Sequence, residues 1–412
     1  MFIRTSTIHQ YARKNKPKLS SGLIWLSSHR FLSQLGSSLF GLFLPIFLYQ
    51  QFEGQLEPLL GFFLIHAILS IFLHPFGAKA MSWLGLNRSM FIGTISYACF
   101  FLSFLGIGNL PLFWVLFLAN IFLLIWRTLY WPPYHTELTQ FMGKRCGQTI
   151  AWLSNIASFI GIIVPLISGF VITEWGYPLL FVFAAVICLF SLIPLLYVPL
   201  VKEEYSFGFR QTYKVLFEKK HRALFYTYAA EGAENEVGLL IWPLFLFEMF
   251  KGNYFDIGFL ATCIVIAAMI FRFIIGKITD KRTPNRLLHL GTGLYAFGWI
   301  VKAFVTTAIQ IFIVATYHSF VMILMRIPFN ALFYERAADA GHYVDEYTVL
   351  REISLNIGKA CMLIFLLIIL HSFNLTFAFF LAAIASIAMN FISKIHFEDQ
   401  TKASASTTTA LP

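Results

Sequence analysis

Charged residues are scarce in this chain. Only 12% of its 412 residues are Asp, Glu, Lys or Arg, whereas 58% are hydrophobic. Water-soluble domains carry about a quarter charged residues, so the composition excludes a soluble globular protein. Apolar runs of about 20 residues, long enough for a helix to cross a bilayer, recur from end to end. A β-barrel would instead show alternating segments of about 10 residues. We therefore predict an all-α polytopic membrane protein.

Signatures of metal, disulfide and nucleotide sites are also lacking. The five cysteines are scattered and show neither metal-binding spacing nor a disulfide framework. The nucleotide-binding motif G-x-x-x-x-G-K-[ST] does not occur, so we expect no direct use of ATP. The apolar segments contain no nucleophile with a matching base. We therefore expect neither an enzyme nor a bound cofactor.

The basic residues are unevenly distributed. One set of loops is rich in Lys and Arg, and the alternate loops hold a single cation, Lys251. Lys and Arg concentrate in the cytoplasmic loops of membrane proteins. This rule places both termini in the cytoplasm and explains the net charge of +10 without nucleic-acid binding. We expect a multi-pass protein of the plasma or inner membrane, with the lipid bilayer as a partner.

Twelve apolar segments are long enough to be membrane spans. They lie near residues 22–50, 57–77, 87–107, 110–132, 148–173, 178–199, 223–249, 255–276, 286–307, 309–333, 349–371 and 374–394. We predict twelve transmembrane helices in two pseudo-symmetric six-helix bundles. The predicted parts are a basic cytoplasmic segment at 1–21, an N-terminal bundle at 22–200, a cytoplasmic linker at 201–222, a C-terminal bundle at 223–394 and a disordered cytoplasmic tail at 395–412.

The two halves of the sequence match each other at an offset of about 200 residues. The corresponding pairs include Gly77 and Gly276, Arg127 and Arg326, and Asn155 and Asn356. Several matches at nearly one offset indicate an internal duplication. Two repeated halves around a central cavity are typical of transporters.

One loop carries a recognisable pattern, Gly276-Lys277-Ile278-Thr279-Asp280-Lys281-Arg282-Thr283-Pro284-Asn285-Arg286. A glycine, an acid four residues later, a basic residue and further cations resemble the cytoplasmic loop motif of the major facilitator superfamily. The counterpart at 77–88 keeps Gly77, Gly85 and Arg88 but has Met81 in place of the acid. The resemblance implies two six-helix bundles that rock around a site in the middle of the membrane.

The resemblance also implies a cytoplasmic gate formed by Gly77, Gly85, Arg88, Gly276, Asp280, Lys281 and Arg286. Glycine lets two helices approach closely. An acid at a helix end can accept bonds from a neighbouring helix N-terminus or from its cations. Such a latch can form in one conformation and break in another. The alternative is that the cations only anchor the loop on the cytoplasmic side.

Three acids interrupt the apolar stretch Ala229–Trp242, namely Glu231, Glu234 and Glu236. A spacing of three residues places Glu231 and Glu234 on one helix face with Asn235, while Glu236 points away. Because lipid cannot host carboxylates, this face should line a central cavity. Two neighbouring carboxyl groups in a site of low dielectric constant favour binding a proton. We therefore predict that Glu231 and Glu234 are proton-coupling sites, with Glu236 bonded to a neighbouring helix.

The alternative for Glu231 and Glu234 is a structural ion pair with Arg30, Arg127 or Arg326. For Arg127 and Arg326 we favour an end-charge network with the acids about ten residues further on, Glu137 and Glu335.

Four more polar residues in the predicted spans are candidates for the cavity, namely Arg30, Gln34, Asn356 and Lys359. Arg30 could bind an anionic substrate, neutralise a glutamate or reach the membrane surface. Asn356 and its counterpart Asn155 are expected to join neighbouring helices. Lys359 needs an acidic partner, and a glutamate of the seventh span could serve. The lone histidines His66 and His318 are expected to have packing roles.

These features predict a secondary active transporter, coupled to protons, that moves a small organic solute by alternating access as a monomer. We favour export of an amphiphilic or cationic compound, because acids line the expected cavity and Gly161, Pro165 and Gly169 partly resemble a motif of the family's exporters. One alternative is proton-coupled nutrient uptake of a sugar or an organic anion. Another is a non-transporting membrane receptor or scaffold with the same fold.

Overall fold

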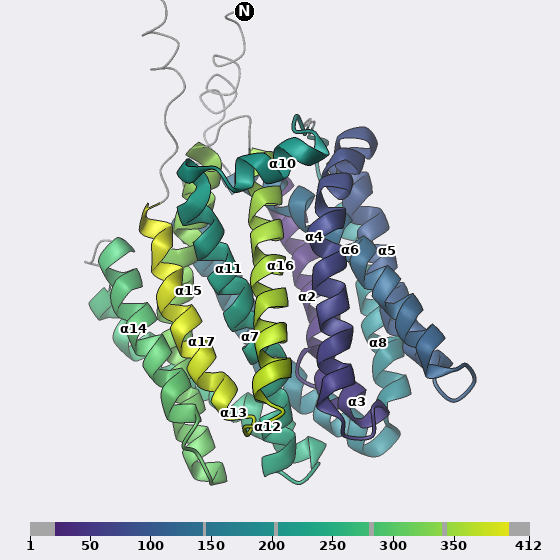
Figure 1. Cartoon of the computed structure of the whole chain (residues 1–412), viewed down its shortest axis with the longest axis vertical. Helices are drawn as coiled ribbons and strands as arrows, with labels where there is room; N and C mark the ends of the chain where they lie inside the picture. The colour runs from purple at the N-terminus through teal and green to yellow at the C-terminus, as the bar shows by residue number, and fades with distance from the viewer. Residues whose placement is uncertain (1–20, 143–145, 202–204, 280–283, 340–343, 395–412) are drawn as a thin grey trace, which may run out of the picture.

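The computed structural model describes residues 21–142, 146–201, 205–279, 284–339 and 344–394. Within these ranges the regular secondary structure is helical, apart from one isolated β-bridge between Ile107 and Leu110. Most helices run side by side along the long axis of the molecule (Figure 1).

The N-terminal half of the chain contains helices α2 to α9. They are α2 (Ser21–Gly41), α3 (Leu44–Gln51), α4 (Leu56–Leu84), α5 (Leu86–Ser103), the 3₁₀ turn η1 (Phe104–Gly106), α6 (Leu112–Met142), α7 (Cys146–Trp175), α8 (Tyr177–Phe190) and α9 (Leu192–Leu195). The linker contains α10 (Phe209–Leu216) and the 3₁₀ turn η3 (Lys219–His221).

The C-terminal half contains the remaining helices. They are α11 (Arg222–Glu236), the π-helix η4 (Val237–Ile241), α12 (Trp242–Met249), α13 (Tyr254–Thr279), α14 (Pro284–Lys302), α15 (Ala308–Asp339), α16 (Val344–Ile369), α17 (Phe377–Ala388) and the 3₁₀ segment η6 (Met389–Lys394). The start of α2, the end of η6 and the linker helix α10 lie at the same end of the molecule (Figure 1), which we call the linker end.

Every predicted span coincides with a helix or with a short series of helices. The first is bent by 40° between α2 and α3, and the seventh contains the π-helix η4. In the described part of the chain, seven helices are long and apolar enough to cross a membrane, or eight if the bent pair α2–α3 is one span. A total of twelve crossings, arranged in two bundles, stays a prediction.

The outer surface of the helices is apolar. Large hydrophobic side chains such as Ile65, Phe117, Phe170, Phe365 and Ile384 are exposed. Water-soluble proteins rarely expose so many large apolar groups together. The surface fits a bundle of helices surrounded by lipid, in agreement with a multi-pass membrane protein.

The helices pack closely where glycines face a neighbouring backbone. A side chain at Gly232 of α11 would overlap the backbone oxygen of Leu355, and one at Gly358 of α16 would overlap that of Ala229. Lipid supplies no hydrophobic force between helices, so such small residues allow the contact. In the same way, the predicted packing motif at Pro165 and Gly169 of α7 lies against α13. The pairs α7–α13 and α4–α16 join the two halves of the chain.

Candidate functional site

The predicted polar face of α11 is present, and an arginine of α15 holds it. Arg326 donates from Nη1 to Glu231 Oε1 and from Nη2 to Glu234 Oε2 and Asn235 Oδ1, each at 2.8 Å. Tyr295 Oη donates to Glu234 Oε1 at 2.6 Å. Both glutamates are buried. Of the three cations considered from the sequence, Arg326 is therefore the one that pairs with them.

The ion pairs continue from α11 into the N-terminal half. Arg351 Nη2 lies 3.2 Å from Glu231 Oε2, and Arg351 Nη1 donates to Glu352 Oε1 at 2.7 Å. Arg127 Nη2 of α6 lies 3.4 Å from Glu352 Oε2. Positive and negative groups alternate along this chain of contacts. Alternation matters because a buried charge costs several kcal/mol unless it is paired.

The predicted end-charge network of Arg127 and Arg326 is wrong. Both arginines contact the acids described above instead of the acids about ten residues further along their helices. Glu137 is fully buried, and neither of its carboxyl oxygens has a hydrogen-bond partner among the described residues. Glu335 is exposed. Arginine side chains are long enough to reach neighbouring helices, and sequence spacing alone does not reveal these partners.

Glu236 and Lys359 form a second buried pair. Lys359 Nζ of α16 donates to Glu236 Oε1 at 2.5 Å, and Glu236 is 3% exposed. This contact confirms that Glu236 bonds a neighbouring helix. It also confirms that Lys359 has a glutamate of the seventh predicted span as its partner.

Glu236 and Lys359 line a cavity of about 220 Å³ between the two halves of the chain. Helices α2, α3, α4, α5 and α6 supply its N-terminal side. The aromatic lining consists of Phe40, Phe63, Tyr97, Phe100, Phe101 and Trp126, and the polar lining includes Ser37, His66 and Arg127. The cavity therefore presents two cations, one anion and many aromatic rings.

The expectation that Glu231 and Glu234 line this cavity is wrong. Arg326 and Tyr295 cover their carboxylates, and Glu236 is the glutamate that faces the cavity. Gly232 faces the backbone of Leu355 and Gly358 faces the backbone of Ala229, so the face of α11 that carries Gly232 packs against α16. Gly232 thus serves helix packing.

Arg30 and Gln34, two further candidates for the cavity, contact residues of the N-terminal half. Arg30 lies over the rings of Trp131 and Tyr134, at 4.8 and 5.7 Å from their centroids, and forms no ion pair within the described residues. Gln34 is half-buried, and its backbone oxygen accepts a bond from Ser37. Arg30 and Gln34 are therefore not brought together with the α11 glutamates.

Asn356 does not join neighbouring helices as expected. Its Nδ2 donates to the backbone oxygen of Glu352, one turn earlier in α16, at 2.7 Å. Its counterpart Asn155 is exposed on α7. The repeat therefore preserves the residue type in both halves, while the surroundings of the two asparagines differ.

The structure describes only part of the predicted gate. A side chain at Gly77 would lie 2.7 Å from the backbone oxygen of Thr128, so this glycine allows α4 to approach α6. Gly85 joins α4 to α5 with a φ of +88°, a conformation that favours glycine, and Arg88 is exposed. Gly276 and Arg286 lie in α13 and α14, but their side-chain surroundings fall outside the description. Asp280 and Lys281 lie outside the described residues, so the latch stays a prediction.

Two buried cations, Arg351 and Lys302, are not among the residues predicted from the sequence. Lys302 of α14 is 4% exposed, and its Nζ lies 3.9 and 4.1 Å from the ring centroids of Trp242 and Trp299. Aromatic faces attract cations in this arrangement. A signal was available, because Lys302 lies inside the predicted span 286–307, near the side whose loops carry a single cation.

Known proteins resemble this chain in their fold and in their family. No curated protein sequence matches this chain. The fold is similar to the crystal structure of the human organic anion transporter MFSD10 (TETRAN), with a TM-score of 0.68, 10% identity, and coverage of 92% of this chain and 100% of that chain. It is also similar to the E. coli fucose:proton symporter FucP, with a TM-score of 0.66, 13% identity, and coverage of 93% and 100%. The family model of the Major Facilitator Superfamily matches residues 26–353. The chain therefore belongs to the Major Facilitator Superfamily.

Proposed function

We propose that this protein is a proton-coupled secondary transporter that moves a small amphiphilic organic anion by alternating access. Membership of the superfamily supports a transporter, and both structural neighbours are described as transporters. The observation that carries the substrate class is the aromatic cavity between the two halves, with Arg127 and Lys359 against a single acid, Glu236.

The charge of the cavity favours an anion over the cationic compound expected from the sequence. Arg326 and Arg351 already pair with Glu231 and Glu234, which leaves no unpaired acid of α11 for a cationic substrate. Lys359 and Arg127 are also paired, with Glu236 and Glu352, but both line the cavity, and Glu236 is the only acid among its described lining residues. An anion can therefore share these two cations, while its apolar part lies against Phe40, Phe100 or other rings of the lining. Ligand sites of this kind are apolar with a few polar groups that set orientation. The description of MFSD10 as an organic anion transporter is consistent with this class.

Proton coupling is assigned to the ion pairs of Glu231 and Glu234. A proton on Glu231 would weaken its contacts with Arg326 and Arg351, and Arg351 contacts Glu352, which in turn contacts Arg127 of the N-terminal half. Proton binding would thereby act on a contact that holds the two halves together. A ligand shifts such an equilibrium only through its different affinity for the two states.

The first test is a thermal-stability screen of the purified protein. Amphiphilic carboxylates and sulfonates are expected to raise the unfolding temperature, whereas amines of matched size are not. Lys359→Gln is expected to lose this stabilisation, because it removes a cation from the cavity. Lys251→Gln is the matched control, since Lys251 is exposed and does not line the cavity. Stabilisation by amines alone would contradict the anionic substrate.

Proteoliposomes then test coupling and direction with the anion that the screen selects. The wild type is expected to accumulate or expel the anion when a pH gradient is imposed. The Glu231→Gln/Glu234→Gln variant is expected to bind it but to ignore the gradient. The sign of the flux separates export from uptake. Binding without any flux in the wild type would favour the receptor or scaffold alternative.

A further inference from the structure

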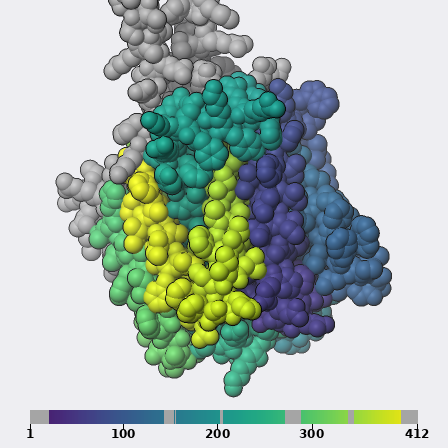
Figure 2. All heavy atoms as spheres, in the orientation of Figure 1, coloured from purple at the N-terminus to yellow at the C-terminus, as the bar shows by residue number. Residues whose placement is uncertain are grey.

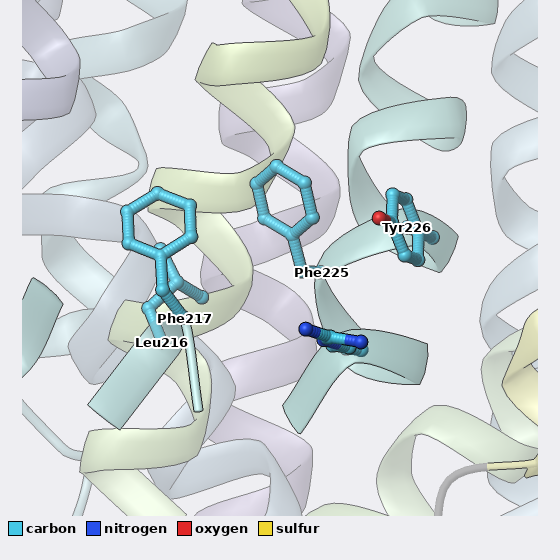
Figure 3. Close-up of a pocket in the computed structure, with 5 residues that line it drawn as sticks. Leu216, Phe217, Phe225 and Tyr226 are labelled. Carbon is cyan, nitrogen blue, oxygen red and sulfur yellow. The ribbon is translucent and has the colours of Figure 1, made fainter. Parts of the chain in front are cut away.

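A second hollow lies at the linker end, away from the central cavity. It has a volume of about 310 Å³ and is lined by Leu216, Phe217, Arg222, Phe225 and Tyr226 (Figure 3). The Nδ1 atom of His221 lies 2.7 Å from the backbone oxygen of Val215, and this contact closes the turn between α10 and α11. The hollow is therefore built at the junction where the linker enters α11.

A row of aromatic rings forms the wall of this hollow. Phe217 and Phe225 lie 5.4 Å apart between ring centroids, Phe225 and Tyr226 also 5.4 Å, and Tyr226 and Phe391 6.1 Å. Phe217 is 58% exposed and Tyr226 is 52% exposed. Tyrosine is enriched where membrane proteins meet the headgroup region of the bilayer, and the phenylalanine rings beside Tyr226 add apolar surface. The rings can pack against the glycerol backbone of a lipid and against the part of its acyl chain next to the glycerol.

The chain around the hollow is strongly basic. Residues 209–222 contain the cations Arg210, Lys214, Lys219, Lys220 and Arg222 and a single acid, Glu218. Glu218 pairs with Lys220 at 3.2 Å. Arg222 lines the hollow, is exposed, and forms no ion pair within the described residues. Basic groups of this kind attract anionic lipid headgroups at the membrane surface.

The linker segment beside the hollow is attached to both halves of the protein. Figure 2 shows the linker segment, in teal, as a cap over the linker end. Tyr213 Oη donates to the backbone oxygen of Ile71 in α4 at 2.8 Å. Ser206 Oγ donates to Glu346 Oε1 of α16 at 2.5 Å. A ligand in the hollow would therefore stabilise the junction between this cap and α11.

We propose that the hollow is a binding site for the headgroup of an anionic phospholipid. Arg222 binds the phosphate, Lys219 and Lys220 add positive charge beside it, and the rings of Phe225 and Tyr226 contact the lipid's apolar part. This site is separate from the proposed transport cavity, so it stands whether or not the substrate assignment is right.

The test measures lipid binding to the full-length protein in detergent. Phosphatidylglycerol is expected to raise the unfolding temperature and to be retained in native mass spectra, whereas phosphatidylcholine is not. Each cation removed is expected to weaken phosphatidylglycerol binding about fivefold. Arg222→Gln should show this loss, and the variant with Lys219→Gln and Lys220→Gln added should show more. Lys79→Gln is the control, because Lys79 is an exposed cation near the end of α4 that does not line the hollow.

Three results would overturn the proposal. The first is equal stabilisation by the two lipids. The second is an equal loss of phosphatidylglycerol binding in Lys79→Gln and Arg222→Gln, which would indicate general surface charge. The third is the same stabilisation by inorganic phosphate alone, which would indicate a site for the free anion. If Arg222→Gln folds poorly, Phe225→Ser provides a second test, since it keeps every charge and removes the central ring.

Discussion

Two buried glutamates, Glu352 and Glu137, have opposite surroundings. Glu352 accepts a bond from Arg351 and lies 3.4 Å from Arg127. In the part of the chain that the structure describes, neither carboxyl oxygen of Glu137 has a hydrogen-bond partner, although the residue is fully buried. Removing one member of a buried ion pair leaves the other charge uncompensated. The two residues should therefore differ sharply in what their charge contributes to stability.

Substituting each glutamate by glutamine tests this difference. Glu352→Gln is expected to lower the free energy of unfolding by about 3–5 kcal/mol, because Arg127 and Arg351 lose their shared partner. Glu137→Gln removes no ion pair or hydrogen bond found among the described residues. Because an unpaired buried carboxylate is costly, its removal is not expected to lower the free energy of unfolding. The unfolding temperature in detergent, measured for both variants at one pH, gives the comparison. Equal losses would show that Glu137 has a partner after all.

The sequence predicted the residues of this network better than their pairing. Helical spacing placed Glu231, Glu234 and Asn235 on one face, and Arg326 was one of three candidate partners. The choice among the three depends on how α11 and α15 pack, which no local pattern records. For the same reason, the helical spacing wrongly placed Glu231 and Glu234 at the cavity, where Glu236 lies instead.

At the level of helices, the contact between α11 and α16 positions both sets of ion pairs. It carries Glu231 and Glu236 on one side, and Arg351 and Lys359 on the other. The contact depends on Gly232 and Gly358, because a side chain at either would overlap the facing backbone. A backbone carbonyl within a helix cannot move aside as a flexible side chain can, so the helices would have to separate.

Alanine at Gly358 tests this dependence. Gly358→Ala is expected to lower the unfolding temperature strongly and to weaken the Glu236–Lys359 pair, by pushing α16 away from α11. Gly293→Ala is the matched control, because nothing lies within 4 Å of the added side chain and Gly293 is also helical. Alanine there should be neutral or stabilising by up to about 1 kcal/mol. Similar losses in both variants would contradict the close approach of α11 and α16.

The sequence predicted where the helices lie. It did not predict where they bend or change to a π-helix. Long apolar runs predicted where helices lie, because hydropathy averages over many residues. The bend between α2 and α3 and the π-helix η4 involve only a few residues each. Neither changes the average hydropathy of its segment, so the sequence showed only that the first and seventh segments are unusually long.

At the scale of the molecule, polar contacts between the two halves lie on both sides of the cavity. At the linker end, His135 Nδ1 lies 2.9 Å from Tyr334 Oη, and the hydroxyl oxygens of Thr136 and Thr348 are 3.5 Å apart. On the other side, Tyr254 Oη donates to Gln50 Oε1 at 2.7 Å. Alternating access requires each of these sets of contacts to open in turn. The internal repeat indicated two halves, but it could not reveal which residues connect them.

A reversible cross-link at the linker end tests whether these contacts must open. Thr136→Cys/Thr348→Cys, in a background without the five native cysteines, places two thiols on facing residues of α6 and α16. Oxidation is expected to stop transport in proteoliposomes, and a reducing agent to restore it, because the halves can no longer separate at this end. Thr292→Cys/Asn390→Cys is the control, since Thr292 donates to Asn390 at 2.9 Å within the C-terminal half. Its cross-link should leave most of the transport rate intact. Undiminished transport through a fully cross-linked Thr136→Cys/Thr348→Cys protein would show that the linker end stays closed throughout the cycle, and the alternating-access proposal would fail.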